Sequence, residues 1–203
     1  MNIQKKSENS IIEYKKKKSE ELPIYFTNQE LKGFFDSIDQ LERNRDYVFF
    51  LTLLGTGKRV SEILTLKRND IDFTNRTIRI ISLKKRKKKT VNIRISQKLA
   101  YFLSVYSGSL TAETRLFSFT RQYADYLFKK YSASAGINYK RVSCHIFRHT
   151  FAIKWLEQGL PIHKLKRHLD HSHINVTMEY LKVVDSDYFQ TVDSFKIFNF
   201  MEK

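Results

Sequence analysis

The chain has 203 residues, 41% of them hydrophobic, with two prolines and six glycines, so it can bury a core and is no linker or collagen-like polymer. Lysine and arginine total 37 against 21 acidic residues, and the net charge of +16 favours a polyanionic partner such as nucleic acid. The single cysteine, Cys144, excludes an internal disulfide framework. No signal peptide is recognisable and no stretch approaches the roughly 18 apolar residues of a membrane span, so we expect a cytoplasmic, DNA-associated protein without membrane contact.

Composition divides the chain into three expected parts. Residues 1–22 contain the charge run Lys15–Lys18 and little apolar periodicity, which predicts a flexible basic arm. Residues 23–183 are predicted to form one folded domain. Residues 184–203 carry a series of phenylalanines and are expected to dock as a tail, either on the same chain or on a neighbouring copy.

Apolar residues at helical spacing predict most of the folded domain. The first helix is expected after Thr27, which forms a capping-box pattern with Glu30. It carries an apolar stripe on one face. Further helical segments are expected at Val48–Leu54 with Gly55 and Gly57 ending it, at about Val60–Leu66, at Leu99–Tyr106, at Ala124–Tyr131, and at Ser143–Leu181 with a break near Gly159 and Pro161.

Between Ile71 and Ile95 the apolar period changes from helical to two, which predicts strands. Thr77–Leu83 is rich in isoleucine, and apolar residues alternate with polar ones through Val91–Ile95. The six basic residues Lys84–Lys89 lie between these strands, at the expected tip of a hairpin, where they face solvent or an anion. Helices with one small antiparallel sheet predict an α+β fold that is mostly helical.

Three short clusters contain residue types that suit chemistry on a phosphate. The first, at 56–62, reads TGKRVSE, and the second, at 145–149, reads HIFRH. The third, at 169–171, reads LDH, and Tyr180 follows its histidine by nine residues. Each cluster alone is common in proteins. Their joint order and spacing are uncommon, because His171 of the third cluster follows Arg148 of the second by 23 positions.

In this order and spacing the clusters resemble those of the tyrosine recombinases, also called the phage integrase family, over roughly residues 24–183. The resemblance implies the catalytic domain of that family, in a short form similar to the fimbrial phase-switch recombinases, because few residues precede the first helix. The family's catalytic positions would fall here on Arg59, Lys84, His145, Arg148, His171 and Tyr180, with Glu62 supporting the first arginine.

The resemblance implies that DNA is cut and rejoined through a 3′-phosphotyrosyl link formed by Tyr180. Arg59 and Arg148 would hold the two non-bridging phosphate oxygens with planar guanidinium forks, which a lysine cannot reproduce. A tyrosine hydroxyl has a pKa near ~10 and needs help to lose its proton, and His145 would be the general base. The covalent link conserves the energy of the broken ester, so no ATP, metal or other cofactor is expected.

The remaining implied roles concern the leaving group and the DNA. Lys84 would protonate the departing oxygen, with Lys85 as the alternative, and His171 would donate a hydrogen bond to the phosphate. We expect the rest of the basic run to contact DNA phosphates or groove edges. These DNA-binding residues are Lys85, Arg86, Lys87, Lys88 and Lys89.

One position departs from the family's pattern. The family usually has glycine before the third-cluster histidine, and this chain has Asp170. If the position requires a positive φ, aspartate is strained there relative to glycine. Its carboxylate would also repel a phosphate.

The resemblance also implies partners and alternatives. Double-stranded DNA is the expected substrate, bound by four copies at two synapsed sites, with an accessory DNA-bending protein as a further partner. Integration, excision, inversion and resolution share one chemistry. A type IB topoisomerase-like enzyme would use the same residues to relax DNA, and a DNA-binding regulator would keep the fold without turnover.

Six histidines lie within 29 residues, and the pairs His145 with His149 and His168 with His171 have spacings that could bind zinc. Against a metal site, Arg148 would place a cation beside the ion. We therefore expect no metal. The histidines outside the family's motif are expected to be structural or solvent-facing: His149, His163, His168 and His173.

Overall fold

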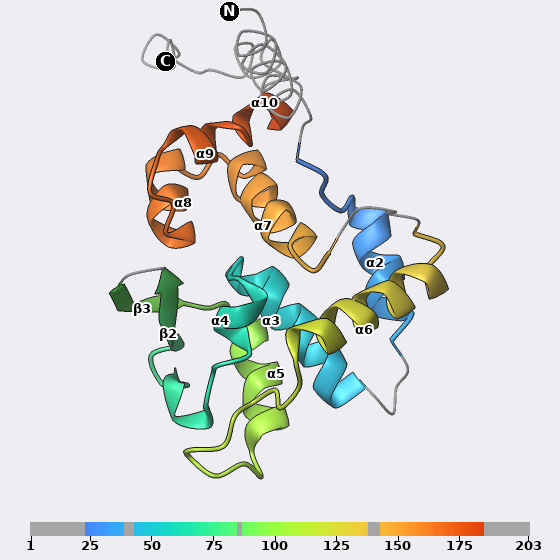
Figure 1. Cartoon of the computed structure of the whole chain (residues 1–203), viewed down its shortest axis with the longest axis vertical. Helices are drawn as coiled ribbons and strands as arrows, with labels where there is room; N and C mark the ends of the chain where they lie inside the picture. Colours follow the sequence, from blue (N-terminus) through green and yellow to red (C-terminus); the bar gives the residue numbers. More distant parts are fainter. Residues whose placement is uncertain (1–22, 39–42, 85–86, 138–142, 185–203) are drawn as a thin grey trace, which may run out of the picture.

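The structure is a computed structural model that shows a mostly helical molecule with one small sheet (Figure 1). The described residues are 23–38, 43–84, 87–137 and 143–184. The predicted basic arm and nearly all of the predicted phenylalanine-rich tail lie outside them. Within the described part of the chain, no helix has both the length and the apolar character needed to cross a membrane.

The predicted α+β class is confirmed. In chain order the elements are α2 (Asn28–Asp36), a π-helical segment (Arg43–Tyr47), α3 (Val48–Thr56), α4 (Val60–Ile63), a 3-10 turn (Arg68–Asp70), β1 (Ile71–Asp72), β2 (Thr77–Lys84), β3 (Lys87–Arg94), α5 (Gln97–Ser107), α6 (Arg121–Ser134), α7 (Ile146–Glu157), α8 (Ile162–Leu169), α9 (Asn175–Met178) and α10 (Leu181–Val184).

Polar side chains begin several of these helices. Thr27 Oγ1 accepts a hydrogen bond from the Glu30 amide, and the Glu30 carboxylate accepts one from the Thr27 amide, so the predicted capping box is confirmed. Ser96 caps α5 and Thr120 caps α6 in the same way, each by accepting an amide N–H three residues later.

Helix α3 lies at the centre of the main core and is buried nearly all round. It runs through Gly55, the first of two glycines predicted to end it. A Cβ at Gly55 would lie 2.9 Å from a side-chain carbon of Leu99 on α5, so the glycine leaves room for this packing. The helix ends at Gly57, the second of the two glycines predicted to end it, whose φ of 60° places it in the left-handed region. α4 is also shorter than predicted and stops at Ile63.

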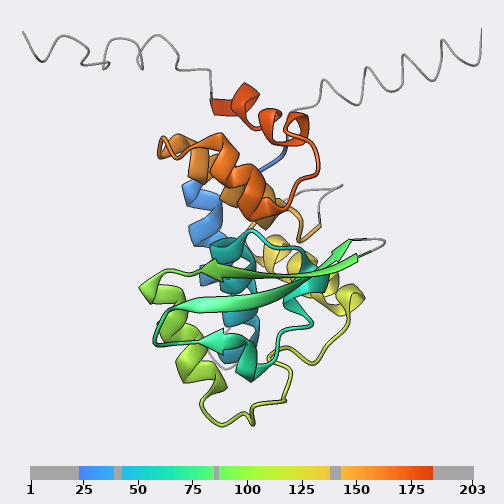
Figure 2. The same ribbon diagram turned by 90° about the vertical axis from the view of Figure 1, so that its left-hand side faces the viewer.

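The three strands form one antiparallel sheet in the order β1-β2-β3. Ile78 pairs with Ile93, and Ile80 pairs with Val91, with their apolar side chains turned toward the core. The strands extend further into the basic run than predicted. Lys84 pairs with Lys87, so the residues between the strands are only 85 and 86, and the run is mostly strand. Both long strands cross one face of the molecule to its edge (Figure 2).

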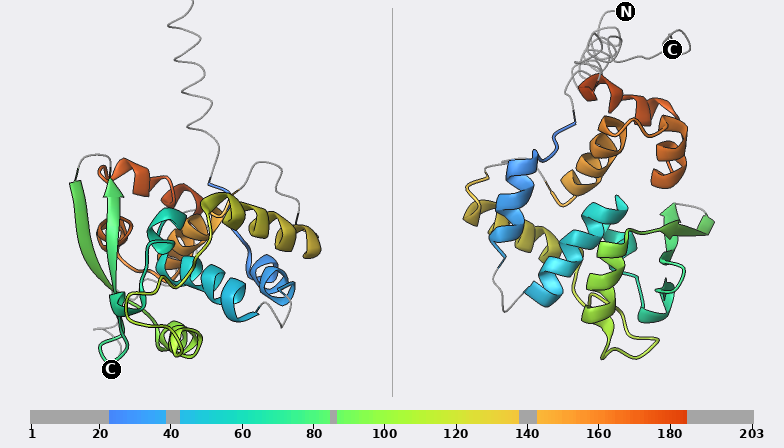
Figure 3. Two further views of the ribbon diagram at one scale, coloured as in Figure 1. Left: turned by 60° about the horizontal axis from the view of Figure 1, so that its bottom comes forward. Right: turned by 180° about the vertical axis from the view of Figure 1, so that it is seen from behind.

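A second, smaller core lies where α8 and α10 pack on α7, and α9 packs against α8 and α10 (Figures 1 and 3). The first turn of α7 contributes Ile146 and Phe147 to the main core, and its later turns contribute Ile153 and Leu156 to the small one. Helix α7 therefore joins the two cores. The three clusters of the sequence meet at this border.

Candidate active site

The first cluster begins in the turn between α3 and α4. A Cβ on Gly57 would lie 2.5 Å from the ring of Phe151 on α7, so only glycine lets this turn pack directly against α7. The amide of Gly57 donates to the carbonyl of Leu53 and closes the helix. This contact brings Arg59, two residues later, beside the helix that carries Arg148.

The Arg59 side chain is held by Glu62 from the same turn. One Glu62 oxygen accepts the Arg59 amide at 2.9 Å, and the other accepts Nη1 of the guanidinium at 3.1 Å. Glu62 is 2% exposed, while the Arg59 side chain is 36% exposed. A buried carboxylate therefore orients a guanidinium that still reaches solvent, which suits an anion-binding group.

Arg148 connects the first cluster to the third. It is 2% exposed, and its Nη1 donates to the carbonyl of Gly57 at 3.0 Å while its Nη2 donates to the carbonyl of Leu169 at 2.6 Å. A guanidinium carries five N–H donors, so donors remain for a bound anion. Burial, with repulsion from Arg59, lowers the pKa of Arg148 to about 10, so the side chain is cationic at neutral pH.

The third cluster starts at the C-terminal cap of α8. Asp170 adopts a φ of 54° and a ψ of 44°, so the position does require the left-handed region. The Ser82 hydroxyl on β2 donates to a carboxylate oxygen of Asp170 at 2.9 Å. The carboxylate that replaces the family's glycine thus ties the sheet to the end of α8.

His171 and Tyr180 lie together after this cap. His171 Nδ1 is 2.9 Å from the Thr177 hydroxyl, and Thr177 is fully buried. The rings of His171 and Tyr180 stack with 15° between their planes and 6.4 Å between their centroids. Tyr180 is 3% exposed and belongs to the small core.

The Tyr180 hydroxyl lies 2.9 Å from Nδ1 of His149 on α7. Burial raises the pKa of Tyr180, and the positive charge of Arg148 opposes that rise. The prediction that His149 is merely structural or solvent-facing misses this contact. The sequence did contain a signal for this contact, because His149 follows His145 by four positions and residues at that spacing share a helix face.

His145 borders a pocket of about 190 Å³ next to Arg59. Neighbouring protein atoms shield the His145 ring from water and so lower its pKa. Electrostatic repulsion by His149, Arg148 and Arg59 acts in the same direction and brings the pKa to about 4. The imidazole is therefore neutral at neutral pH. An anion bound beside these cations would raise its pKa. The other residues that line the pocket are Val60, Ser61, Arg121, Asp125 and Ser143.

The predicted catalytic lysine is placed by its backbone alone. Lys84 ends β2 and lies two residues after Ser82, whose hydroxyl contacts Asp170. The strand that carries Lys84 therefore reaches the third cluster. Among the predicted DNA-binding residues, Lys89 is exposed, and the side chains of the four before it lie outside the described residues.

Lys58 is a buried cation that the sequence did not single out. It is 4% exposed, and its Nζ donates to the carbonyl of His168 near the end of α8. Burial lowers the pKa of Lys58 to about 8, while the carboxylates of Glu62 and Asp170 act in the opposite direction. The added negative charge of Asp170 thus has a cation among its neighbours.

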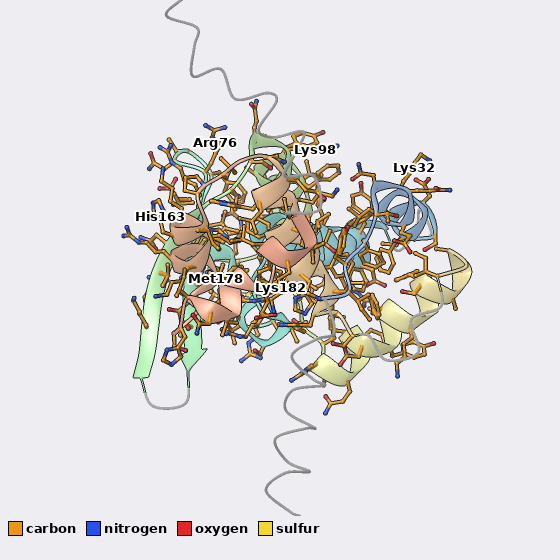
Figure 4. All side chains as sticks on the ribbon, turned by 90° about the horizontal axis from the view of Figure 1, so that it is seen from above. Lys32, Arg76, Lys98, His163, Met178 and Lys182 are labelled. Atoms are coloured by element: carbon orange, nitrogen blue, oxygen red, sulfur yellow. The ribbon has the colours of Figure 1, made fainter. Side chains whose placement is uncertain are left out.

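The other histidines are structural or exposed, as predicted. His168 stacks on Phe151, and its Nε2 lies 2.7 Å from the carbonyl of Thr56. His163 projects outward from α8 into solvent (Figure 4), and His173 is exposed. Across the described ranges, no group of three or more His, Cys, Asp or Glu side chains is arranged to hold a metal ion.

Comparison with known proteins decides the family. The sequence profile of the phage integrase family matches residues 24–186. The chain belongs to the tyrosine recombinase (phage integrase) family. The described structure of this family member agrees with that assignment, because its three clusters meet around Arg148.

Related recombinases cover most of this chain. Tyrosine recombinase XerA of Thermococcus onnurineus is 33% identical over 172 residues, which is 80% of this chain and 59% of that protein. A probable integrase/recombinase of Acholeplasma phage L2 is 34% identical over 139 residues, or 66% of this chain and 47% of that protein. The chain thus spans roughly half to three fifths of these relatives' length.

Solved structures share the fold. A crystal structure of XerA recombinase superposes with a TM-score of 0.70 at 23% identity and covers 82% of this chain and 64% of that one. The catalytic domain of bacteriophage HP1 integrase has a TM-score of 0.65 at 24% identity, with 88% of this chain and 98% of that domain covered. XerH site-specific recombinase bound to a palindromic difH substrate, in a post-cleavage complex, has a TM-score of 0.67 at 21% identity over 86% of this chain and 53% of that one.

Proposed function

We propose that the chain is the catalytic part of a site-specific DNA recombinase that cuts and rejoins strands through a 3′-phosphotyrosyl intermediate. The observation that carries the proposal is the position of Arg148. Its guanidinium holds the turn before Arg59 and the end of α8 before His171. The hydroxyl of Tyr180 contacts His149, the residue that follows Arg148.

The chemistry requires fixed positive charge. In the transition state of phosphodiester cleavage the attacking, non-bridging and leaving oxygens all carry negative charge. Arg59 and Arg148 offset it from a site that is already assembled, since Glu62 and two carbonyls orient their guanidinium groups. Preorganised donors are effective because they do not reorient during the reaction.

The remaining groups move protons or bind the phosphate. Tyr180 attacks phosphorus and a histidine takes its proton, for which the motif nominates His145, the N-cap residue of α7. Lys84 protonates the departing 5′ oxygen. His171 donates to the phosphate: if Thr177 donates to Nδ1, the ring proton lies on Nε2, which can serve as donor.

Because the phosphotyrosyl link stores the energy of the broken ester, the reaction needs no ATP, and the arginines replace a metal ion. Double-stranded DNA is the proposed substrate, in keeping with the net charge of +16 and with the difH substrate bound in the XerH site-specific recombinase structure. Four copies on two synapsed sites, with an accessory DNA-bending protein, complete the proposal. Integration, excision, inversion and resolution are its outcomes.

A nicked suicide duplex tests the proposal, with EDTA present and ATP absent. The wild-type protein should give a protein–DNA band that survives denaturation, Tyr180→Phe should give none, and the matched control Tyr126→Phe, on an exposed face of α6, should behave as wild type. DNA binding without any wild-type band would favour a DNA-binding regulator and end the enzyme proposal. Ladders of relaxed plasmid without recombinants would favour a topoisomerase.

A further inference from the structure

We infer that His149 is a catalytic residue that orients the Tyr180 hydroxyl and accepts its proton during DNA cleavage. The inference rests on the proposed function and names the partner of the nucleophile. The Tyr180 hydroxyl lies 2.9 Å from His149 Nδ1, which is within the range of an acid–base pair. His145, the nominated base, meets His149 edge-on with 4.8 Å between ring centroids.

Both partners of this contact are held in place by packing. Tyr180 lies in the small core, and its amide donates to the carbonyl of Thr177, so its ring enters from the turn between α9 and α10. His149 is fixed on α7, one residue after Arg148 and one turn after His145. The hydroxyl therefore faces the imidazole of His149, and the positive charge of Arg148 favours its ionised form.

His149 can accept a proton in this environment. Burial, with a contribution from Arg148, lowers the pKa of His149 to about 4, so the ring is neutral at neutral pH. A neutral imidazole whose proton lies on Nε2 presents an open lone pair at Nδ1. The charge of a bound phosphodiester makes the ring more basic at the moment when the proton has to move.

In the cleavage step, Tyr180 Oη forms a bond to phosphorus, its proton moves to His149 Nδ1, and the bond from phosphorus to the 5′ oxygen breaks. The leaving oxygen takes a proton from the general acid, for which Lys84 is proposed. In rejoining, the 5′ hydroxyl attacks and the imidazolium returns its proton to the tyrosine. His145 then remains beside Arg59 at the pocket, where it can contact the phosphate.

Two substitutions separate orientation from proton transfer. His149→Phe keeps a planar ring and removes both nitrogens. His149→Asn keeps an oxygen or N–H near the position of Nδ1 but has no basic nitrogen. Single-turnover cleavage of the nicked duplex should fall about 100-fold or more in His149→Phe and remain at least about tenfold low in His149→Asn, as expected for loss of a general base. His163→Phe, on an exposed histidine, should cleave at the wild-type rate.

A fluorinated tyrosine at position 180 provides a readout that a structural role does not move. A more acidic hydroxyl needs less help from a base, so it should restore much of the rate lost in His149→Phe. Thermal melting and DNA binding report whether each variant is folded. Wild-type cleavage by His149→Phe, or a defect that the fluorinated tyrosine leaves at full size, would overturn the inference. The wild-type band would still support the proposed function in either case.

Discussion

The guanidinium of Arg148 donates a 2.6 Å hydrogen bond to the carbonyl of Leu169, and a second bond reaches Gly57 at 3.0 Å. Gly57 precedes Arg59 by two residues, and Leu169 precedes His171 by two. One buried side chain therefore fixes the spacing between two segments more than a hundred residues apart in the chain. The same group that is proposed to bind the phosphate also assembles the site.

This double role predicts two effects of Arg148→Lys. An ammonium cannot replace a planar fork at two carbonyls and an anion together, so suicide-duplex cleavage should fall by about 100-fold or more. A buried carbonyl left without its donor should also lower the free energy of unfolding by about 2 kcal/mol. Cleavage kinetics and urea unfolding measure the two effects separately.

The matched control is Arg115→Lys, which changes an exposed arginine in the loop before α6. It should leave cleavage unchanged and alter stability by no more than about 0.5 kcal/mol. If Arg148→Lys cleaved as fast as this control, the guanidinium would have no role in the transition state.

The hydrogen bond between Ser82 and Asp170 should stabilise the fold. Asp170→Ala loses a hydrogen bond to a charged acceptor and keeps the left-handed backbone that the wild-type residue already has, so it should destabilise the fold by about 2 kcal/mol. Asp170→Gly loses the same bond but relieves the strain, and should be milder by about 1 kcal/mol. Urea unfolding of both variants provides the comparison.

A double-mutant cycle isolates the tether itself. Ser82→Ala combined with Asp170→Ala should show a coupling of about 1 kcal/mol, because Ser82 is buried and donates to a charged acceptor. Additive effects would show that the sheet and the end of α8 are not tied through this bond.

Burial of His168 should make the fold less stable in acid. Its pKa is lowered by burial from 6.5 to about 4 in the folded protein, so the unfolded chain binds the proton more tightly. The stabilisation is complete above about pH 6.5 and is lost as the pH falls toward 4, with an upper bound of about 3 kcal/mol.

The variant His168→Phe tests this sign. It keeps an aromatic ring against Phe151 and removes the titrating group together with its bond to Thr56. It should be less stable than wild type at pH 7, and the difference should shrink by pH 4.5. A gap of constant size across this range would mean that His168 titrates normally in the folded protein.

The basic hairpin predicts a salt effect on DNA binding. Replacing the four residues of 86–89 with glutamine should flatten the plot of log affinity against log salt by up to ~0.9 for each phosphate that the variant no longer neutralises. The change should be similar for any DNA sequence, because phosphate contacts carry no base information. An unchanged slope would place the hairpin away from DNA.

Local patterns predicted much of the fold. The capping box at Thr27 and Glu30 and the alternation in β2 and β3 depend on neighbours in sequence or across one hairpin, and both are confirmed. Long-range packing decided what the sequence missed. Gly55 lies inside α3, where Leu99 of α5 packs closely on it, and a lysine-rich run that was predicted as a hairpin tip pairs as strand.

The same distinction holds at the site. The spacing of the clusters nominated Arg59, Arg148 and Tyr180. In the structure Arg148 bonds to Gly57, two residues before Arg59, and the Tyr180 hydroxyl contacts His149, one residue after Arg148. The sequence spacing could not reveal that His149 meets the Tyr180 hydroxyl, because that contact forms only when the turn after α9 packs on α7. The Ser82 contact of the third cluster likewise needs the sheet in place.

The most direct test of the account is to identify the amino acid that becomes linked to DNA. The covalent complex from the suicide duplex, digested with nuclease and protease, should give by mass spectrometry a single peptide in which Tyr180 carries the 3′-phosphate of the cleaved strand. Linkage to another residue, or to a 5′-phosphate, would contradict the proposal that the side chains around Arg148 act on one scissile phosphate with Tyr180 as nucleophile.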